Sequence, residues 1–192
     1  MPASHTGDFL ITSTSGAAAL PFATVTADLF QQVFRQPPFS VNEATLARQR
    51  KYFPQLTNRP GFRLTLAQTA DTYLGFGYGY LLPSDSRWWS NIVEPLDEDF
   101  VQETGGRTFA IIDYGVLPRW RGCGIGRAIH DELLAGSGAA RATLAVRPSA
   151  VETQAIYRRW GWRKIGHEIM EPPAPAPEFD VLVLNQMPGI TR

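Results

Sequence analysis

The stretch of sequence that decides the fold is Val116-Leu117-Pro118-Arg119-Trp120-Arg121-Gly122-Cys123-Gly124-Ile125-Gly126-Arg127. It follows an apolar run at 108–112, typical of a central strand, and it opens a helix predicted over about 124–135. Glycines at alternate positions let the backbone approach a ligand closely, and the first amides of the helix face that ligand with the positive end of the helix dipole. The arginines add charge-assisted contacts to phosphate. The stretch therefore predicts a pyrophosphate site.

Three other kinds of glycine-rich turn are alternatives to a pyrophosphate site, and the sequence excludes two of them. An ordinary glycine-rich strand-to-helix turn is the alternative when the glycines are considered alone. The dinucleotide fingerprint G-x-G-x-x-G does not fit, because Gly122, Gly124 and Gly126 are spaced G-x-G-x-G. A Walker loop does not fit either, because no Gly-Lys-Ser or Gly-Lys-Thr follows.

Two overlapping frames of the turn match one family signature, Gln/Arg-x-x-Gly-x-Gly/Ala after a strand: residues 119–124 in full, and residues 121–126. Downstream, Gln154-Ala155-Ile156-Tyr157-Arg158-Arg159-Trp160-Gly161-Trp162 is similar to a helix-and-strand segment of the same family, in which a tyrosine precedes Gly-Phe or Gly-Trp. The chain therefore resembles the GNAT superfamily of acetyl-CoA-dependent N-acetyltransferases. The motifs cover residues 107–170, and element order alone extends the resemblance to the rest.

The resemblance implies a role in binding CoA for each matched position. The CoA pyrophosphate would be held by the main-chain amides of Arg121, Gly122, Cys123, Gly124, Ile125, Gly126 and Arg127. Arg119 would lie close to it. Val116 and Leu117 would pair with the pantetheine arm like a partial strand, in a slot where their strand splays from the strand at 142–146. One usual polar contact is missing, because the family's asparagine near the start of the later helix is replaced by Ala150.

Candidate catalytic groups follow from the chemistry of amine attack on a thioester. Tyr157 is expected to protonate the departing thiolate, and an amide near Val116 to stabilise the oxyanion. Asp113 is the carboxylate best placed to take a proton from the amine; Glu94, Asp97 and Asp99 are weaker choices. The structural alternatives are a tyrosine packed on the core and an aspartate with only local hydrogen bonds. In this family the base varies and can be a water.

The elements expected around these motifs give an α/β fold. Capping boxes at Ser40 and Ser149 open two helices, which follow an amphipathic helix at 25–34, and Pro54 is expected to close the first of the two. Strands are predicted at 62–66, 72–80, 142–146, 162–169 and 179–184, with a long insertion at 84–106. We expect one domain over 1–192, a mixed sheet with helices on both faces and, from the resemblance, a GNAT-like splay at the CoA site.

One predicted strand has an unusual face. Gly75, Gly77 and Gly79 share one side of it, while Phe76 and the two tyrosines that follow at alternate positions share the other. A face without side chains permits close approach by a helix or by a ligand.

Composition excludes several classes of protein. The chain has 192 residues with 18 Lys and Arg against 18 Asp and Glu, so a dedicated nucleic-acid binder is not expected. The single cysteine, Cys123, forms no internal disulfide, and three scattered histidines suggest no metal site. No apolar run approaches the length of a membrane helix, and the first basic residue is Arg35, so we expect a cytoplasmic protein without a leader. The resemblance is compatible with a homodimer, since dimers are frequent in the family.

The sequence suggests an acceptor, and it leaves alternatives. Acidic residues at 94–103 close to Trp88 and Trp89 would suit a small cationic amine. A protein or peptide N-acetyltransferase is the second hypothesis, and a non-catalytic acyl-CoA-binding regulatory module is the third. We expect Cys123 to contact CoA in the loop and not to act as a nucleophile.

Overall fold

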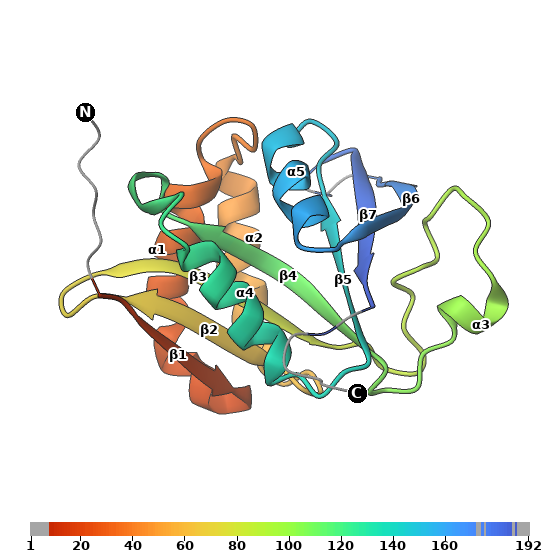
Figure 1. Ribbon diagram of the computed structural model, residues 1–192, viewed down its shortest axis with the longest axis horizontal. Coiled ribbons are helices and arrows are strands. Elements are labelled where there is room, and N and C mark those ends of the chain that lie inside the picture. Colours follow the sequence, from red (N-terminus) through yellow and green to blue (C-terminus); the bar gives the residue numbers. More distant parts are fainter. Residues whose placement is uncertain (1–7, 172–173, 175, 186, 188–192) are drawn as a thin grey trace.

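A seven-stranded mixed sheet organises the chain (Figure 1). The computed structural model describes residues 8–171, 174, 176–185 and 187. The strands are β1 Leu10–Ser15, β2 Arg63–Gln68, β3 Tyr73–Leu81, β4 Thr108–Val116, β5 Arg141–Val146, β6 Arg163–Ile169 and β7 Glu178–Leu184. They lie in the order β1-β2-β3-β4-β5-β7-β6, and every neighbouring pair is antiparallel except β4 with β5.

Helices cover both faces of this sheet, as predicted. Helices α1 (Ala23–Phe34) and α2 (Glu43–Leu56) pack on one face, and α4 (Ile125–Ala135) crosses the other (Figure 1). Helix α5 (Val151–Arg159) joins α4 over β5 and β7. Short helical turns complete the chain at η1 Gly16–Phe22, α3 Glu98–Val101 and η2 Pro118–Trp120. No helix in the described ranges is long and apolar enough to cross a bilayer.

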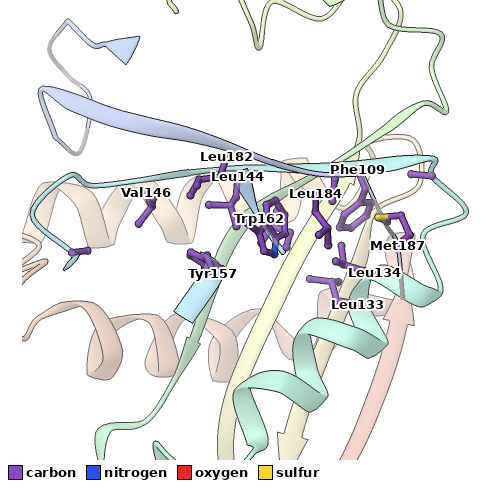
Figure 2. Packing of buried hydrophobic residues seen from close by; sticks show 14 residues of the cluster. Phe109, Leu133, Leu134, Leu144, Val146, Tyr157, Trp162, Leu182, Leu184 and Met187 are labelled. Carbon is purple, nitrogen blue, oxygen red and sulfur yellow. The ribbon is translucent and has the colours of Figure 1, made fainter. Parts of the chain in front are cut away.

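The core is divided by the sheet into clusters on opposite faces. Phe30, Phe53 and Tyr78 belong to the cluster under α1 and α2. The cluster under α4 and α5 is shown in Figure 2, where Val146 and Tyr157 lie toward one end and Met187 toward the other. Burial of these apolar side chains supplies the main force that holds the helices on the sheet.

Three predicted helix ends differ from the structure. Helix α2 runs past Pro54 to Leu56, because a proline in the last turn removes only one backbone hydrogen bond. Its N-cap is Asn42, whose Oδ1 accepts from the Thr45 amide at 2.9 Å, and not Ser40. The capping box predicted at Ser149 does not form: Ala150 occupies the N-cap of α5 without a side-chain bond.

The glycine face of β3 admits a helix. A Cβ atom on Gly75 would lie 3.0 Å from Cδ1 of Ile129, and one on Gly77 would lie 3.1 Å from Cγ2 of the same residue. Both contacts are tighter than side chains normally allow, so the two glycines let α4 approach the sheet closely. The helix alternative is therefore confirmed at these two positions.

The insertion at 84–106 is anchored by a buried ion pair. Glu103 Oε1 accepts hydrogen bonds from Arg141 Nη2 at 2.9 Å, from Thr108 Oγ1 at 2.8 Å and from Trp89 Nε1 at 3.0 Å. Arg141 also donates to the Phe100 carbonyl at 2.7 Å. Several charge-assisted bonds thus fix both ends of the loop to the start of β4 and β5.

Candidate active site

Strands β4 and β5 separate along their length. Their parallel pairing covers only Thr108 with Arg141, Phe109 with Ala142, and Ala110 with Thr143. Beyond Ala110, β4 stays paired with β3 while β5 stays paired with β7, and the two ribbons diverge (Figure 1). The predicted splay of the sheet is therefore confirmed.

At the end of β4, the backbone polar groups of Val116 point into the gap between β4 and β5. The Leu117 amide donates to the Leu74 carbonyl at 2.9 Å, toward β3. Because successive residues of a strand direct their polar groups to opposite edges, the amide of Val116 points away from β3 and into the gap. The Val116 carbonyl on that edge accepts from Arg121 Nε at 3.1 Å. Since the Leu117 carbonyl also accepts from Trp120 at 2.9 Å, Val116 is the better candidate of the two for pairing with a ligand.

The glycines of the turn have two different roles. Gly122 and Gly124 have φ of 79° and 81°, in the left-handed region, and Gly124 is the N-cap of α4. No atom lies within 4 Å of a Cβ placed on either one, so this backbone faces open space. Gly126 differs, because a Cβ there would lie 2.7 Å from the Tyr114 hydroxyl. The open backbone and the helix start fit a diphosphate.

The side chains of the turn lie mostly in solvent. Arg119, Arg121 and Cys123 are exposed, whereas Ile125 is buried under the helix. Arg127 Nε binds Asp131 Oδ2 at 2.6 Å, and its guanidinium lies 5.6 Å from the centre of the Trp160 ring. The backbone of the turn, not a rigid set of cations, therefore makes the preformed part of the site.

A cavity of about 430 Å³ lies between β4, β5 and the helices α1 and α2. Both predicted catalytic side chains, Asp113 and Tyr157, line it. They come from different segments, one from the middle of β4 and the other from α5. The structure therefore brings them to one cavity although they are far apart in the sequence.

Asp113 lines the cavity, and its carboxylate accepts a hydrogen bond there. The Tyr78 hydroxyl donates to Asp113 Oδ2. Removal of the carboxyl from bulk water raises the pKa of Asp113 to about 6, although the bond from Tyr78 acts in the opposite direction. A carboxylate with such a pKa is ionised at neutral pH and can take up a proton.

Tyr157 is buried and stays protonated. Burial raises the pKa of its phenol above the ordinary range. Its ring centre lies 5.8 Å from that of Trp162 and 6.5 Å from that of Tyr114. Figure 2 shows Tyr157 and Trp162 in the same cluster. Packing against these rings holds the side chain in place, and the raised pKa keeps its hydroxyl protonated and able to donate a hydrogen bond.

Several residues of the cavity carry no signal in the sequence. Tyr78 alternates with the glycines of β3. This pattern predicted that Tyr78 lies on the face of the strand opposite the glycines, but it indicated no function. Glu168 of β6 is the second carboxylate that lines the cavity, and burial raises its pKa. Tyr114 and Gln49 line it as well. These side chains belong to no motif, and only the packing of distant elements brings them together.

The acidic residues of the insertion do not line the cavity. Asp97, Glu98 and Asp99 are exposed and lie outside the cavity lining. Glu94 accepts a hydrogen bond from the His167 amide at 2.7 Å, and Glu103 forms a buried ion pair with Arg141. Only Trp88 of the loop reaches the cavity, held by a 3.1 Å bond from its Nε1 to Thr143 Oγ1. The acidic cluster therefore gives no support to a cationic substrate.

A mixed sheet with helices on both faces, opened between β4 and β5, matches the acyl-CoA N-acyltransferase class of fold. The model of the Acetyltransferase (GNAT) family matches residues 26–162, and the chain belongs to that family. It is an acetyl-CoA-dependent acyltransferase. A search of curated proteins finds no match.

Solved structures confirm the fold at low sequence identity. PH1933 from Pyrococcus horikoshii OT3 is 15% identical with a TM-score of 0.63, over 93% of this chain and 99% of that one. An IAA acetyltransferase from Bacillus cereus ATCC 14579 is 14% identical with a TM-score of 0.57, over 93% and 100%. A GNAT family acetyltransferase from Elizabethkingia anophelis, solved with acetyl-CoA bound, is 13% identical with a TM-score of 0.56, over 94% and 100%.

Proposed function

We propose that the protein transfers an acetyl group from acetyl-CoA to the primary amine of a small molecule that binds in the cavity. The observation that carries this proposal is the position of Asp113, a carboxylate with a pKa of about 6 on the wall of a cavity beside the β4–β5 gap. Acetyl-CoA supplies the activated acyl group as a thioester.

Asp113 acts as the general base in this proposal. An amine reaches the site as an ammonium ion at neutral pH, and it must lose a proton before its nitrogen can attack. The ionised carboxylate attracts the ammonium and then accepts its proton at an oxygen. The Tyr78 hydroxyl, bonded to Oδ2, holds the carboxylate in place, so Oδ1 is the oxygen left for the amine.

Val116 and Tyr157 act on the other side of the reaction. The amide of Val116, directed into the gap, donates to the acyl oxygen where negative charge develops. The Tyr157 hydroxyl donates to the departing sulfur. Because burial raises its pKa, this phenol keeps its own proton and stabilises the departing thiolate by a hydrogen bond as the carbon–sulfur bond breaks, and the CoA thiolate takes its proton from solvent.

The turn between β4 and α4 binds the coenzyme in the same proposal. Backbone amides hold the diphosphate, and the arginines supply charge at the open face. The residues assigned to this role are Val116, Leu117, Arg119, Arg121, Gly122, Cys123, Gly124, Ile125, Gly126 and Arg127. Of these, Leu117 acts only by fixing the end of β4, since its amide donates to the Leu74 carbonyl and its side chain packs in the core under α1 and α2.

The two other functions predict different measurements. A protein or peptide acetyltransferase would prefer peptide amines to free amines, whereas a cavity of this size favours a small acceptor. A regulatory module would bind acetyl-CoA without transfer, and Tyr157→Phe would not change a rate. The cytoplasmic location and the homodimer stay predictions.

Asp113→Asn tests the proposal. The rate of amine acetylation, followed by mass spectrometry, is expected to fall by about 10²- to 10⁴-fold, and the acidic limb of the pH profile of kcat/KM near pH 6 should disappear. The exposed Asp28→Asn serves as control. A variant that retains both the rate and the acidic limb would exclude Asp113 as the base.

Stability provides a second readout for the same variant. The folded-state pKa of Asp113 lies above its unfolded value, so ionisation opposes folding at pH 7 and this cost disappears as the pH falls below about 4. Asp113→Asn should therefore raise the free energy of unfolding at pH 7, by up to about 3 kcal/mol. Urea denaturation at pH 7 and at pH 4 measures this difference.

A further inference from the structure

Helix α5 carries Tyr157, and its first turn lacks the usual side-chain cap. Ala150 is the N-cap residue and forms no side-chain hydrogen bond with the helix. The first amides of a helix have no partner within the helix, so a start without a cap is weakly held by its own backbone. The position of α5 on the sheet therefore depends on contacts made by other side chains.

Gln154, in the second turn of α5, ties the helix to the loop that precedes it. Its Nε2 donates to the Arg147 carbonyl at 3.2 Å and to the Pro148 carbonyl at 3.4 Å. The same nitrogen donates to Asp180 Oδ2 at 2.9 Å. Because an amide nitrogen has two hydrogens, at least one of them is shared between two of the three acceptors. One side chain thus joins α5, the end of β5 and β7.

Asp180 gives Gln154 a fixed anion to bind. It lies on β7 opposite Val146, at the end of β5, and is 6% exposed. Lys164 Nζ lies 2.5 Å from its Oδ1, and His167 Nδ1 lies 3.3 Å from the same oxygen. Burial acts to raise the pKa of Asp180, but the hydrogen bonds of its carboxylate outweigh this effect and hold the pKa below its usual value. The bond from Gln154 is therefore charge-assisted at neutral pH.

Gln154 and Tyr157 lie three residues apart on α5, so their side chains are neighbours on the helix surface. Thr153 and Tyr157 line the cavity, whereas Gln154 and Asp180 do not. A rotation or shift of α5 on the sheet would move the Tyr157 hydroxyl relative to the gap between β4 and β5. A displacement of about 1 Å at a reacting group can cost about 10²-fold in rate, so the contact that fixes α5 matters for the transfer step.

We propose that Gln154, bonded to Asp180, is a positioning residue for acetyl transfer, which holds α5 in the orientation that presents the Tyr157 hydroxyl to the departing sulfur. This inference rests on the proposed function, because it concerns the role given there to Tyr157. Gln154 touches neither the acceptor nor the reacting atoms, and it acts through the helix.

Two exchanges at Gln154 test whether its N–H donors are needed. Methionine keeps the length of the side chain without a donor, whereas lysine keeps donors for Asp180 and the two carbonyls. We expect the single-turnover rate of acetyl transfer to fall about tenfold in Gln154→Met and to stay within about twofold of the parent in Gln154→Lys. The Kd of acetyl-CoA should change little in both. Gln55→Met, the same exchange at an exposed site, is the matched control.

Three results would overturn this role of Gln154. The first is an unchanged transfer rate in Gln154→Met. The second is an equal loss of rate in the methionine and lysine variants, because the donors would then not matter. The third is a loss confined to the Kd of acetyl-CoA, since a residue that orients Tyr157 acts on the transfer step and not on coenzyme affinity.

A double-mutant cycle with Tyr157→Phe separates positioning from general support of the fold. If Gln154 acts through the Tyr157 hydroxyl, Gln154→Met should change the transfer rate by less than about twofold once that hydroxyl is absent. A tenfold loss in both backgrounds would show a merely structural role and overturn the inference, while the role of Tyr157 would stand. A parental rate in Tyr157→Phe alone would instead contradict the role of Tyr157 in the proposed function, and this inference with it.

Discussion

Two parts of the site adjoin the same strand, β4, and they are built differently. The turn at 119–127 is exposed, and its preformed part is backbone, with left-handed glycines and the first amides of α4. The cavity beside the middle of β4 is built from side chains of α1, α2, β3, β4, β5 and α5. A backbone site depends on a short continuous segment, whereas a side-chain site depends on packing between segments.

The largest effect is expected from Gly124→Leu in the turn. A side chain at this left-handed position fills the open space that we assign to the diphosphate, so acetyl-CoA affinity should fall by about 100-fold or more. Calorimetry measures this loss. Gly138→Leu is the matched control, because Gly138 also has a positive φ of 69° and open space around its Cβ. Both variants should lose about 1 kcal/mol of stability. Equal acetyl-CoA binding by the two would contradict the role of the turn.

In the cavity, Tyr157→Phe should slow the transfer step without weakening the binding of acetyl-CoA. Loss of the hydroxyl should lower kcat about 10- to 100-fold, while the Kd of acetyl-CoA changes little, since the ring remains packed. Single-turnover kinetics separates the two quantities. Tyr73→Phe, at a position outside the cavity lining, is the control. A change confined to Kd would place Tyr157 in coenzyme binding and not in the transfer step.

A smaller effect is expected from Tyr78→Phe, which keeps the aromatic wall and removes one hydrogen bond. The Tyr78 hydroxyl lowers the pKa of Asp113, so its removal should raise that pKa above about 6. The acidic limb of kcat/KM should move to higher pH, with a loss of several-fold at pH 6.5 and little change at pH 8. A limb that does not move would mean that another group gives rise to it.

The smallest effect is expected from neutralising the insertion in the triple variant Asp97→Asn, Glu98→Gln and Asp99→Asn. These side chains are exposed and outside the cavity, so the KM for the amine should change by less than about twofold at physiological salt. Steady-state kinetics checks this expectation. A clear increase in KM would show that the insertion contributes to the binding of the acceptor.

Local sequence patterns predicted most of the helices and strands. They were wrong about three helix ends. The amphipathic spacing of α1 and the apolar run of β4 gave those elements because burial follows such periodicity directly. Pro54 and Ser149 misled the prediction of helix ends, since a proline in the last turn costs α2 only one backbone hydrogen bond and α5 begins one residue later, with Ala150 as its N-cap. In the acidic insertion, Glu103 forms a buried ion pair with Arg141 that anchors the loop, a role that the sequence pattern did not indicate, while its suggested role with a cationic amine stays a prediction.

Asp113 shows most clearly what the tertiary structure adds. Strict alternation along β4 would place it on the face of Phe109 and Ile111, under α4 and α5. The register against β3 shifts at Ile112, so Tyr78 faces Asp113 while Gly79 faces Ile111. This bulge turns the carboxylate toward Tyr78 and the cavity below α1 and α2.

The sequence by itself determined the glycine turn at 119–127, the helix that follows it and the family, because glycine conformation and helix starts are properties of consecutive residues. The tertiary structure alone decided the pKa of Asp113 and the set of side chains that line the cavity. These properties depend on desolvation and on distances between elements that are far apart in the chain.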